Sequence, residues 1–75
     1  MERTLDLRGL SCPIPLIEAR RALAGMEPGA VLVVLATDPE APIDLAALAT
    51  DGGHGFAWEL LQGGEWRLTL TRAPA

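Results

Sequence analysis

The sequence contains no lysine and no tyrosine, and only one cysteine and one histidine among its 75 residues. A single cysteine cannot form an internal disulfide, so no disulfide framework is possible and the cytosol is the expected compartment. One cysteine and one histidine also cannot supply the roughly four ligands of a zinc site. No apolar run approaches the roughly 20 residues that cross a bilayer. The N-terminus lacks the basic start and long apolar stretch of a signal peptide.

Basic residues are also sparse, because six arginines stand against ten acidic residues and give a formal net charge of −4. Nucleic-acid binding depends on clustered positive charge, and only Arg20 and Arg21 are adjacent. We therefore expect no direct contact with nucleic acid and none with a membrane. A hydrophobic share of 49% and a mean hydropathy of +0.25 are typical of a globular protein. The length predicts one small domain over residues 1–75.

Hydrophobic periodicity predicts the element order β-α-β-α-β-β. Alternation of apolar and polar residues indicates half-buried strands. The continuous aliphatic run at residues 30–36 indicates a central strand. From Pro13 onward, apolar residues recur at the spacing of a helix. Glycine pairs end the second helix and join the last two strands into a hairpin. The expected elements are strands at residues 4–8, 30–36, 56–61 and 66–71, and helices at residues 13–26 and 43–50.

This order predicts an α+β two-layer sandwich. The strand–helix–strand crossover implies a parallel pair, and two helices cover one face of the sheet. The second strand must still turn apolar side chains to the uncovered face, a modest indication of a partner or a self-contact. A monomer or weak homodimer is expected. Trp58 and Trp66 are expected on alternating faces of the hairpin, where core or cross-strand packing explains them better than ligand binding.

The single cysteine stands in the segment Leu-Ser-Cys-Pro-Ile-Pro at residues 10–15. If the helix begins at Pro13, Cys12 is its N-cap and lies at the carboxyl end of the first strand. The positive helix end would then face the sulfur and lower the pKa of Cys12. A lone cysteine is more often a buried apolar filler. Because cysteine is not a preferred capping residue, a chemical role is favoured here.

Elimination narrows that chemical role. A cysteine hydrolase would need a histidine base, and His54 lies beyond the second helix with no evident route to Cys12. A dithiol oxidoreductase would need a second cysteine. What remains is a one-thiol carrier that accepts a group on sulfur and hands it on. Two alternatives stay open: an interaction or regulatory module with an idle cysteine, and a redox-sensing single thiol.

Residues 5–16, LDLRGLSCPIPL, resemble the signature of the TusA/SirA/YedF-like sulfur carriers, whose hallmark is Cys-Pro-x-Pro after a strand. The similarity continues through residues 17–23, 28–29 and 37–39 and the closing hairpin. It implies a βαβαββ sandwich with a mixed four-stranded sheet of order 1-2-4-3, strand four antiparallel, and two helices on one face. It also implies that Cys12 carries a persulfide.

The resemblance further implies the partners of that persulfide. The donor would be a cysteine desulfurase or a rhodanese-like protein, and the acceptor a protein of tRNA thiolation, molybdenum-cofactor maturation or sulfur oxidation. The chain would then be a carrier more than a complete enzyme. No cofactor is expected beyond the transient persulfide, and no metal.

Five other residues match family positions around the cysteine. Pro13 and Pro15 match the residues that shape its loop. Arg20, Asp38 and Ile14 match positions that bear on partner binding, although Ile14 departs from the acidic residue that some members have there. As alternatives, Arg20 is a solvated helix residue and Asp38 a turn or capping residue.

Overall fold

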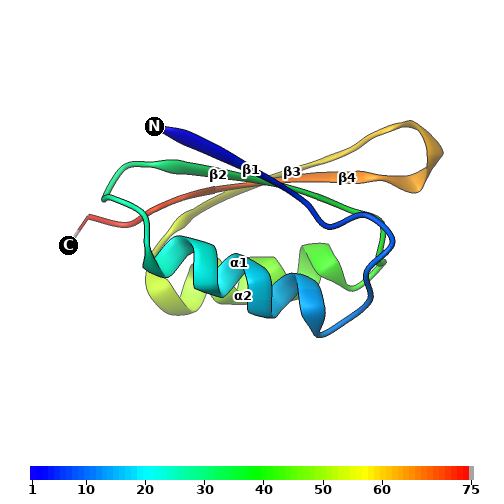
Figure 1. The fold of residues 1–75 in the computed structure, drawn as a ribbon, viewed down its shortest axis with the longest axis horizontal. Helices are drawn as coiled ribbons and strands as arrows, with labels where there is room; N and C mark the ends of the chain where they lie inside the picture. The colour runs from blue at the N-terminus through cyan, green and yellow to red at the C-terminus, as the bar shows by residue number, and fades with distance from the viewer. Residues whose placement is uncertain (75) are drawn as a thin grey trace.

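The computed structural model describes residues 1–74, and they form the predicted order of elements (Figure 1). The elements are β1 (Glu2–Asp6), α1 (Ile14–Ala24), β2 (Val31–Ala36), α2 (Ala41–Gly52), β3 (Gly55–Leu60), the 3₁₀ turn η1 (Gln62–Gly64) and β4 (Trp66–Thr71). Helix α2 is longer than predicted because Pro42 is accommodated in its first turn, where a missing N–H removes no helical hydrogen bond. None of the helices in residues 1–74 has the length and apolar character that a membrane crossing requires.

The four strands form one mixed sheet in the order β1-β2-β4-β3. β1 pairs with β2 in parallel, and β4 runs antiparallel to both of its neighbours. Both helices lie on the same face of this sheet, as Figure 1 shows. The expected two-layer sandwich and strand order are therefore confirmed.

The core lies between the sheet and the helices and is made mainly of leucine, valine and alanine. Strand β2 alternates between fully buried and half-buried side chains along its length. Its half-buried positions face the uncovered side of the sheet, so the predicted apolar contribution of β2 to that side is confirmed. The fully buried leucines and valine are Leu32, Val34, Leu45, Leu68 and Leu70.

The two tryptophans lie on the same face of the hairpin, so the expectation of alternating faces is wrong. Trp58 is paired with Leu68, and Leu60 is paired with Trp66. This register, set by the loop at residues 61–65, puts the even-numbered side chains of both strands on the helix side. The two indole rings are 5.7 Å apart in a T-shaped arrangement. The expected cross-strand packing is therefore present.

Gly53 ends α2 in the left-handed conformation, with φ of 71°. An added Cβ would meet no atom within 4 Å there, so backbone strain is the main cost of a side chain. We expect Gly53→Ala to lower the free energy of unfolding by about 1 kcal/mol, measured by urea denaturation. The matched control is Gly25→Ala, where φ is −96° and stability should hold or rise slightly. Equal losses in the two variants would contradict this explanation.

Candidate functional site

Cys12 lies in the loop between β1 and α1, where its side chain is exposed. Because β1 and β2 are parallel, the loops that follow them meet at the same end of the sheet (Figure 1). The loop after β2 thereby brings Asp38 to the cysteine. The Cys12 N–H donates a hydrogen bond to the Asp38 carboxylate.

Pro13, and not Cys12, is the N-cap of α1, so the expected cap position is wrong by one residue. The Ile14 N–H donates to the Ser11 carbonyl, 3.0 Å away, and the Ile17 N–H donates to the Pro13 carbonyl at the same distance. The Cys12 backbone is held instead by Asp38, since a carboxylate is a stronger acceptor than a neutral group. Cys12 therefore precedes the helix rather than capping it.

The sulfur of Cys12 is hydrogen-bonded to a second acidic residue. The Sγ–H group donates to Oδ2 of Asp44, 3.2 Å away. Asp44 stands in the first turn of α2, and the start of that helix is fixed by the Glu40 N–H, which donates to Oδ1 of Asp38 at 3.0 Å. Asp38 thus ties the cysteine loop to the helix that presents Asp44.

These carboxylates raise the pKa of Cys12 above its ordinary value. The hydrogen bond to Asp44 is the largest cause, followed by desolvation and then by the negative charges of Asp44, Glu40 and Asp38. The expectation that the α1 N-terminus lowers the pKa of Cys12 is therefore wrong. That expectation took into account only α1, the helix that follows Cys12, and not the acidic residues at the start of α2. The hydrogen bond and the nearby negative charges favour the neutral thiol over the thiolate.

The remaining predicted site residues are spread along α1. Pro15 is fully buried against the core, and Ile14 is 43% exposed beside Cys12. Arg20 is exposed further along the helix, and none of the ion pairs among residues 1–74 includes it. The structure brings Cys12, Pro13, Ile14 and Asp38 together and leaves Arg20 apart from them. The partner-binding roles stay predictions.

His54 takes no part in this site. Its Nδ1 accepts a hydrogen bond from the Ala73 backbone N–H at 2.9 Å, and the backbone N–H of His54 donates to the Ala49 carbonyl. These contacts lie at the C-terminal end of α2, whereas Asp44 lies at the N-terminal end. The expectation that His54 is separate from Cys12 is confirmed.

Comparison with known proteins identifies the family. The model of the family described as "Sulfurtransferase TusA" matches residues 3–72. The chain belongs to the TusA family. The expected membership of the TusA/SirA family is thereby confirmed.

Relatives and one solved structure agree with this membership. A putative sulfur carrier protein of Neisseria meningitidis is 53% identical over 51 residues, which cover 68% of this chain and 69% of that protein. The sulfur carrier protein TusA of Allochromatium vinosum is 33% identical over 72 residues, which cover 96% and 95% of the two chains. The crystal structure of a SirA-like protein from Desulfitobacterium hafniense has a TM-score of 0.88 at 30% identity, with 95% and 97% coverage.

Asp44 and Glu40 are site residues of this TusA-family chain that the sequence interpretation did not identify. A weak signal was available, because Asp44 is an acidic residue in the first turn of a helix that follows a central strand. Negative side chains are common there for the helix dipole alone. Only the packing of α2 beside α1 shows that Asp44 meets the sulfur.

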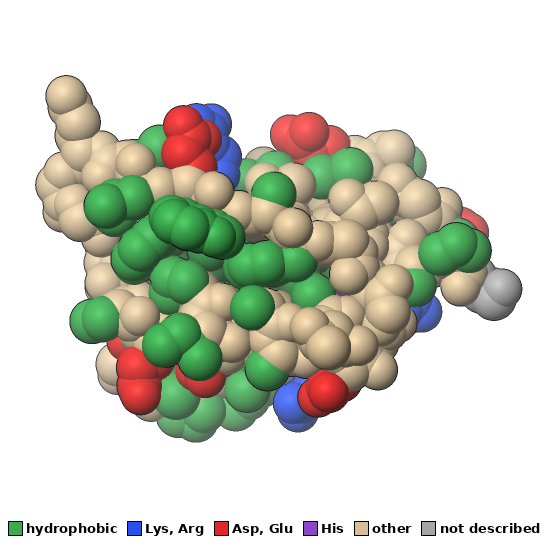
Figure 2. Space-filling model, turned by 180° about the vertical axis from the view of Figure 1, so that it is seen from behind, with side chains coloured by type: hydrophobic (Ala, Val, Ile, Leu, Met, Phe, Trp, Pro, Cys, Tyr) green, Lys and Arg blue, Asp and Glu red, His purple; other side chains and the backbone are tan. Residues whose placement is uncertain are grey.

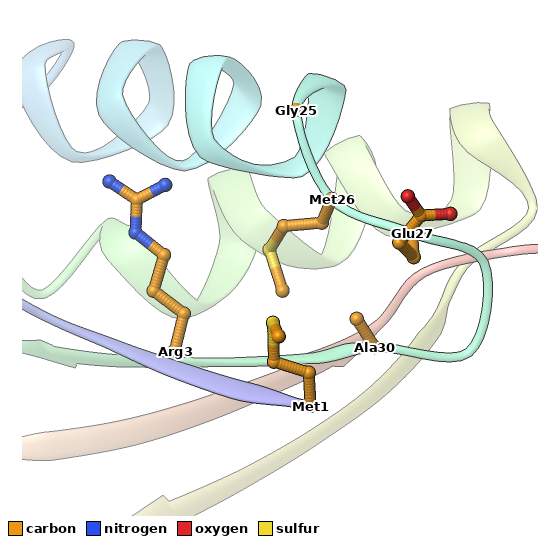
Figure 3. Close-up of a pocket in the computed structure, with 6 residues that line it drawn as sticks. All are labelled: Met1, Arg3, Gly25, Met26, Glu27 and Ala30. Atoms are coloured by element: carbon orange, nitrogen blue, oxygen red, sulfur yellow. The ribbon is translucent and has the colours of Figure 1, made fainter.

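The Cys12 thiol of this TusA-family chain lies outside the cavity shown in Figure 3. That pocket, of about 330 Å³, is at the other end of β1, where the side chains of Met1 and Met26 point towards each other. Its lining residues are Met1, Arg3, Gly25, Met26, Glu27 and Ala30. Within residues 1–74 no group of three His, Cys, Asp or Glu side chains is placed to hold a metal ion.

Proposed function

We propose that this chain is a sulfur carrier that holds sulfane sulfur as a persulfide on Cys12. The observation that carries the proposal is an exposed single thiol at the meeting point of two loops, held by Asp38 and Asp44 and outside the cavity described above. An exposed thiol is accessible to another protein. Membership of the TusA family, with relatives named as sulfur carriers, supports the same function.

The proposed transfer conserves electrons. The Cys12 thiolate attacks the terminal sulfur of a donor persulfide, a new S–S bond forms on Cys12, and the S–S bond of the donor breaks. The donor cysteine leaves as a thiolate. In the delivery step Cys12 takes the role that the donor cysteine had before. An acceptor nucleophile attacks the terminal sulfur, and Cys12 leaves as a thiolate. No external oxidant or reductant enters either exchange.

The donor in this proposal is a cysteine desulfurase or a rhodanese-like protein, and the acceptor is another protein. The acceptor belongs to tRNA thiolation, molybdenum-cofactor maturation or sulfur oxidation. We place the carrier in the cytosol, where a lone thiol stays reduced. Pro13 and Pro15 serve to stiffen the loop, since proline fixes the backbone angle φ.

The acidic surroundings of Cys12 favour the carrier over a redox sensor. Sensor cysteines are typically low-pKa thiols, whereas Asp44, Glu40 and Asp38 raise the pKa of Cys12. A protonated thiol reacts slowly with peroxide because the thiolate is the nucleophile. In the free protein, Cys12 is therefore expected to react slowly with oxidants and to react mainly with a specific protein partner.

The test measures sulfur on the intact protein. Reduced protein is incubated with a cysteine desulfurase and free cysteine, and its mass is recorded before and after dithiothreitol. We expect the gain of one sulfur atom, its loss on reduction, and no gain in Cys12→Ser. If several desulfurases and rhodanese-like donors load no sulfur, and a partner binds equally well with or without Cys12, the protein is an interaction module instead.

A further inference from the structure

The net charge of the chain is concentrated at the end that carries Cys12. The residues at this end occupy the carboxyl ends of β1, β2 and β3, the first turn of α2 and the start of β4. Six acidic residues against two arginines give this end a formal charge of −4, while the other four acidic residues and four arginines of the chain cancel. The charged residues at this end are Asp6, Arg8, Asp38, Glu40, Asp44, Glu59, Glu65 and Arg67.

The two arginines at this end are already paired. Arg8 binds Asp6 at 2.7 Å and Glu65 at 3.5 Å, and Arg67 binds Glu59 at 2.9 Å. No ion pair in the described part of the chain reaches the three carboxylates of Asp38, Glu40 and Asp44. We call these three the acidic triad. Their charge is compensated by no arginine of residues 1–74, so it is available to a partner.

An exposed apolar surface accompanies the acidic triad. Trp58 is 62% exposed and Leu60 is 56% exposed on the helix side of the hairpin, in contact with the half-buried Trp66. We call these three residues the hairpin patch. Ile43, next to Asp44 in α2, is 70% exposed. Figure 2 shows hydrophobic side chains gathered over this part of the surface, and a contiguous group that contains tryptophan is typical of protein interfaces.

We propose that the hairpin patch, Ile43 and the acidic triad form one docking surface. Its occupant is the protein that donates sulfur to Cys12, which presents apolar side chains to the patch and lysine or arginine side chains to the triad. The proposal rests on the proposed carrier function. Charge complementarity of this kind accelerates encounter and fixes the orientation of two proteins, and exposed tryptophan supplies the apolar contact area of interface hot spots.

Docking of a basic surface also prepares the thiol for reaction. The charged groups that face Cys12 are Asp38 from the loop after β2 and Glu40 and Asp44 from the start of α2. Lysine or arginine side chains of the donor would neutralise their field and lower the pKa of Cys12, so the thiolate forms where the donor persulfide is present. The carrier is thereby reactive on contact and protected when alone.

The experiment compares two sulfur sources for each variant. A cysteine desulfurase with free cysteine loads Cys12 by docking, and inorganic polysulfide loads it without docking. We expect Trp58→Ser to slow loading from the desulfurase about tenfold and Glu40→Gln to slow it severalfold, with a weaker dependence on salt. Loading from polysulfide should stay unchanged in Trp58→Ser and rise in Glu40→Gln, because Glu40 is one of the negative charges that raise the pKa of Cys12. Glu27→Gln, at the other end of the molecule, is the charge-matched control and should resemble wild type in both assays.

The outcomes separate the two proposals. If wild-type protein is loaded by no desulfurase or rhodanese-like protein, the carrier function is refuted. If the desulfurase loads wild type, and loads Trp58→Ser and Glu40→Gln at the same rate as wild type, only the docking surface is refuted. Equal slowing with desulfurase and with polysulfide would also refute it, because the substitutions would then act on the thiol or the fold.

Discussion

Cys12 of the Asp44→Asn variant will react with iodoacetamide several times faster than wild-type Cys12 near neutral pH. The Asp44 carboxylate accepts the S–H hydrogen bond at 3.2 Å and is the largest cause of the raised pKa of Cys12. Asparagine keeps the size of the side chain and removes its charge. Its amide group can also donate a hydrogen bond to a thiolate. Both changes favour the anion, which is the form that is alkylated.

The pH dependence of the alkylation rate shows in which direction the substitution moves the pKa of Cys12. Alkylation follows the thiolate fraction, so its midpoint in wild type lies above the ordinary pKa of cysteine, and in Asp44→Asn it moves to lower pH. Above both midpoints the two rates converge, with the variant slightly slower because a less basic thiolate is a weaker nucleophile. The control is Asp51→Asn, the same change at the other end of α2, which should leave the midpoint in place. A variant midpoint at or above that of wild type would contradict the role of Asp44.

Leu45→Ala will lower the free energy of unfolding by about 2–5 kcal/mol. Leu45 follows Asp44 in α2 and is fully buried among the core residues of the sheet. Its truncation removes apolar contact and leaves a cavity in a small core. Small domains have roughly 5 kcal/mol of stability in total, so the substitution removes a large share of that free energy. Circular dichroism during urea titration measures the change.

Ile43→Ala is the matched control for Leu45→Ala. Both positions lie near the start of α2, but Ile43 is 70% exposed. Substitutions at exposed sites usually change stability by about 0.5 kcal/mol or less. Similar losses at the two positions would contradict core packing of Leu45 as the cause of the effect.

The fold could be predicted from the sequence in most respects. The alternation in β2 and the helical spacing after Pro13 are local patterns that burial imposes on any two-layer sandwich, so element order and layers followed from them. The strand order followed from the family resemblance, because spacing alone does not determine which strand occupies the centre. The faces of Trp58 and Trp66 were predicted wrongly since one residue of register in the hairpin reverses the side to which a residue points.

The candidate site was predicted only in part. The sequence identifies Cys12 through its neighbouring prolines, and the resemblance adds Asp38. The direction of the pKa shift of Cys12 was predicted wrongly because it depends on Asp44, which is 32 residues away in the chain. A contact of that range is produced by helix packing, and no local pattern in either segment encodes it.

The T-shaped pair of Trp58 and Trp66 provides the protein with an optical reporter. Indole rings 5.7 Å apart couple excitonically, so the hairpin contributes its own couplet to the circular dichroism spectrum. The chain has no tyrosine and no other tryptophan, and its ultraviolet-excited emission therefore originates almost wholly in this hairpin. A protein that covers Trp58 changes the polarity around the emitting ring. Its arrival can thus be followed on the unlabelled carrier.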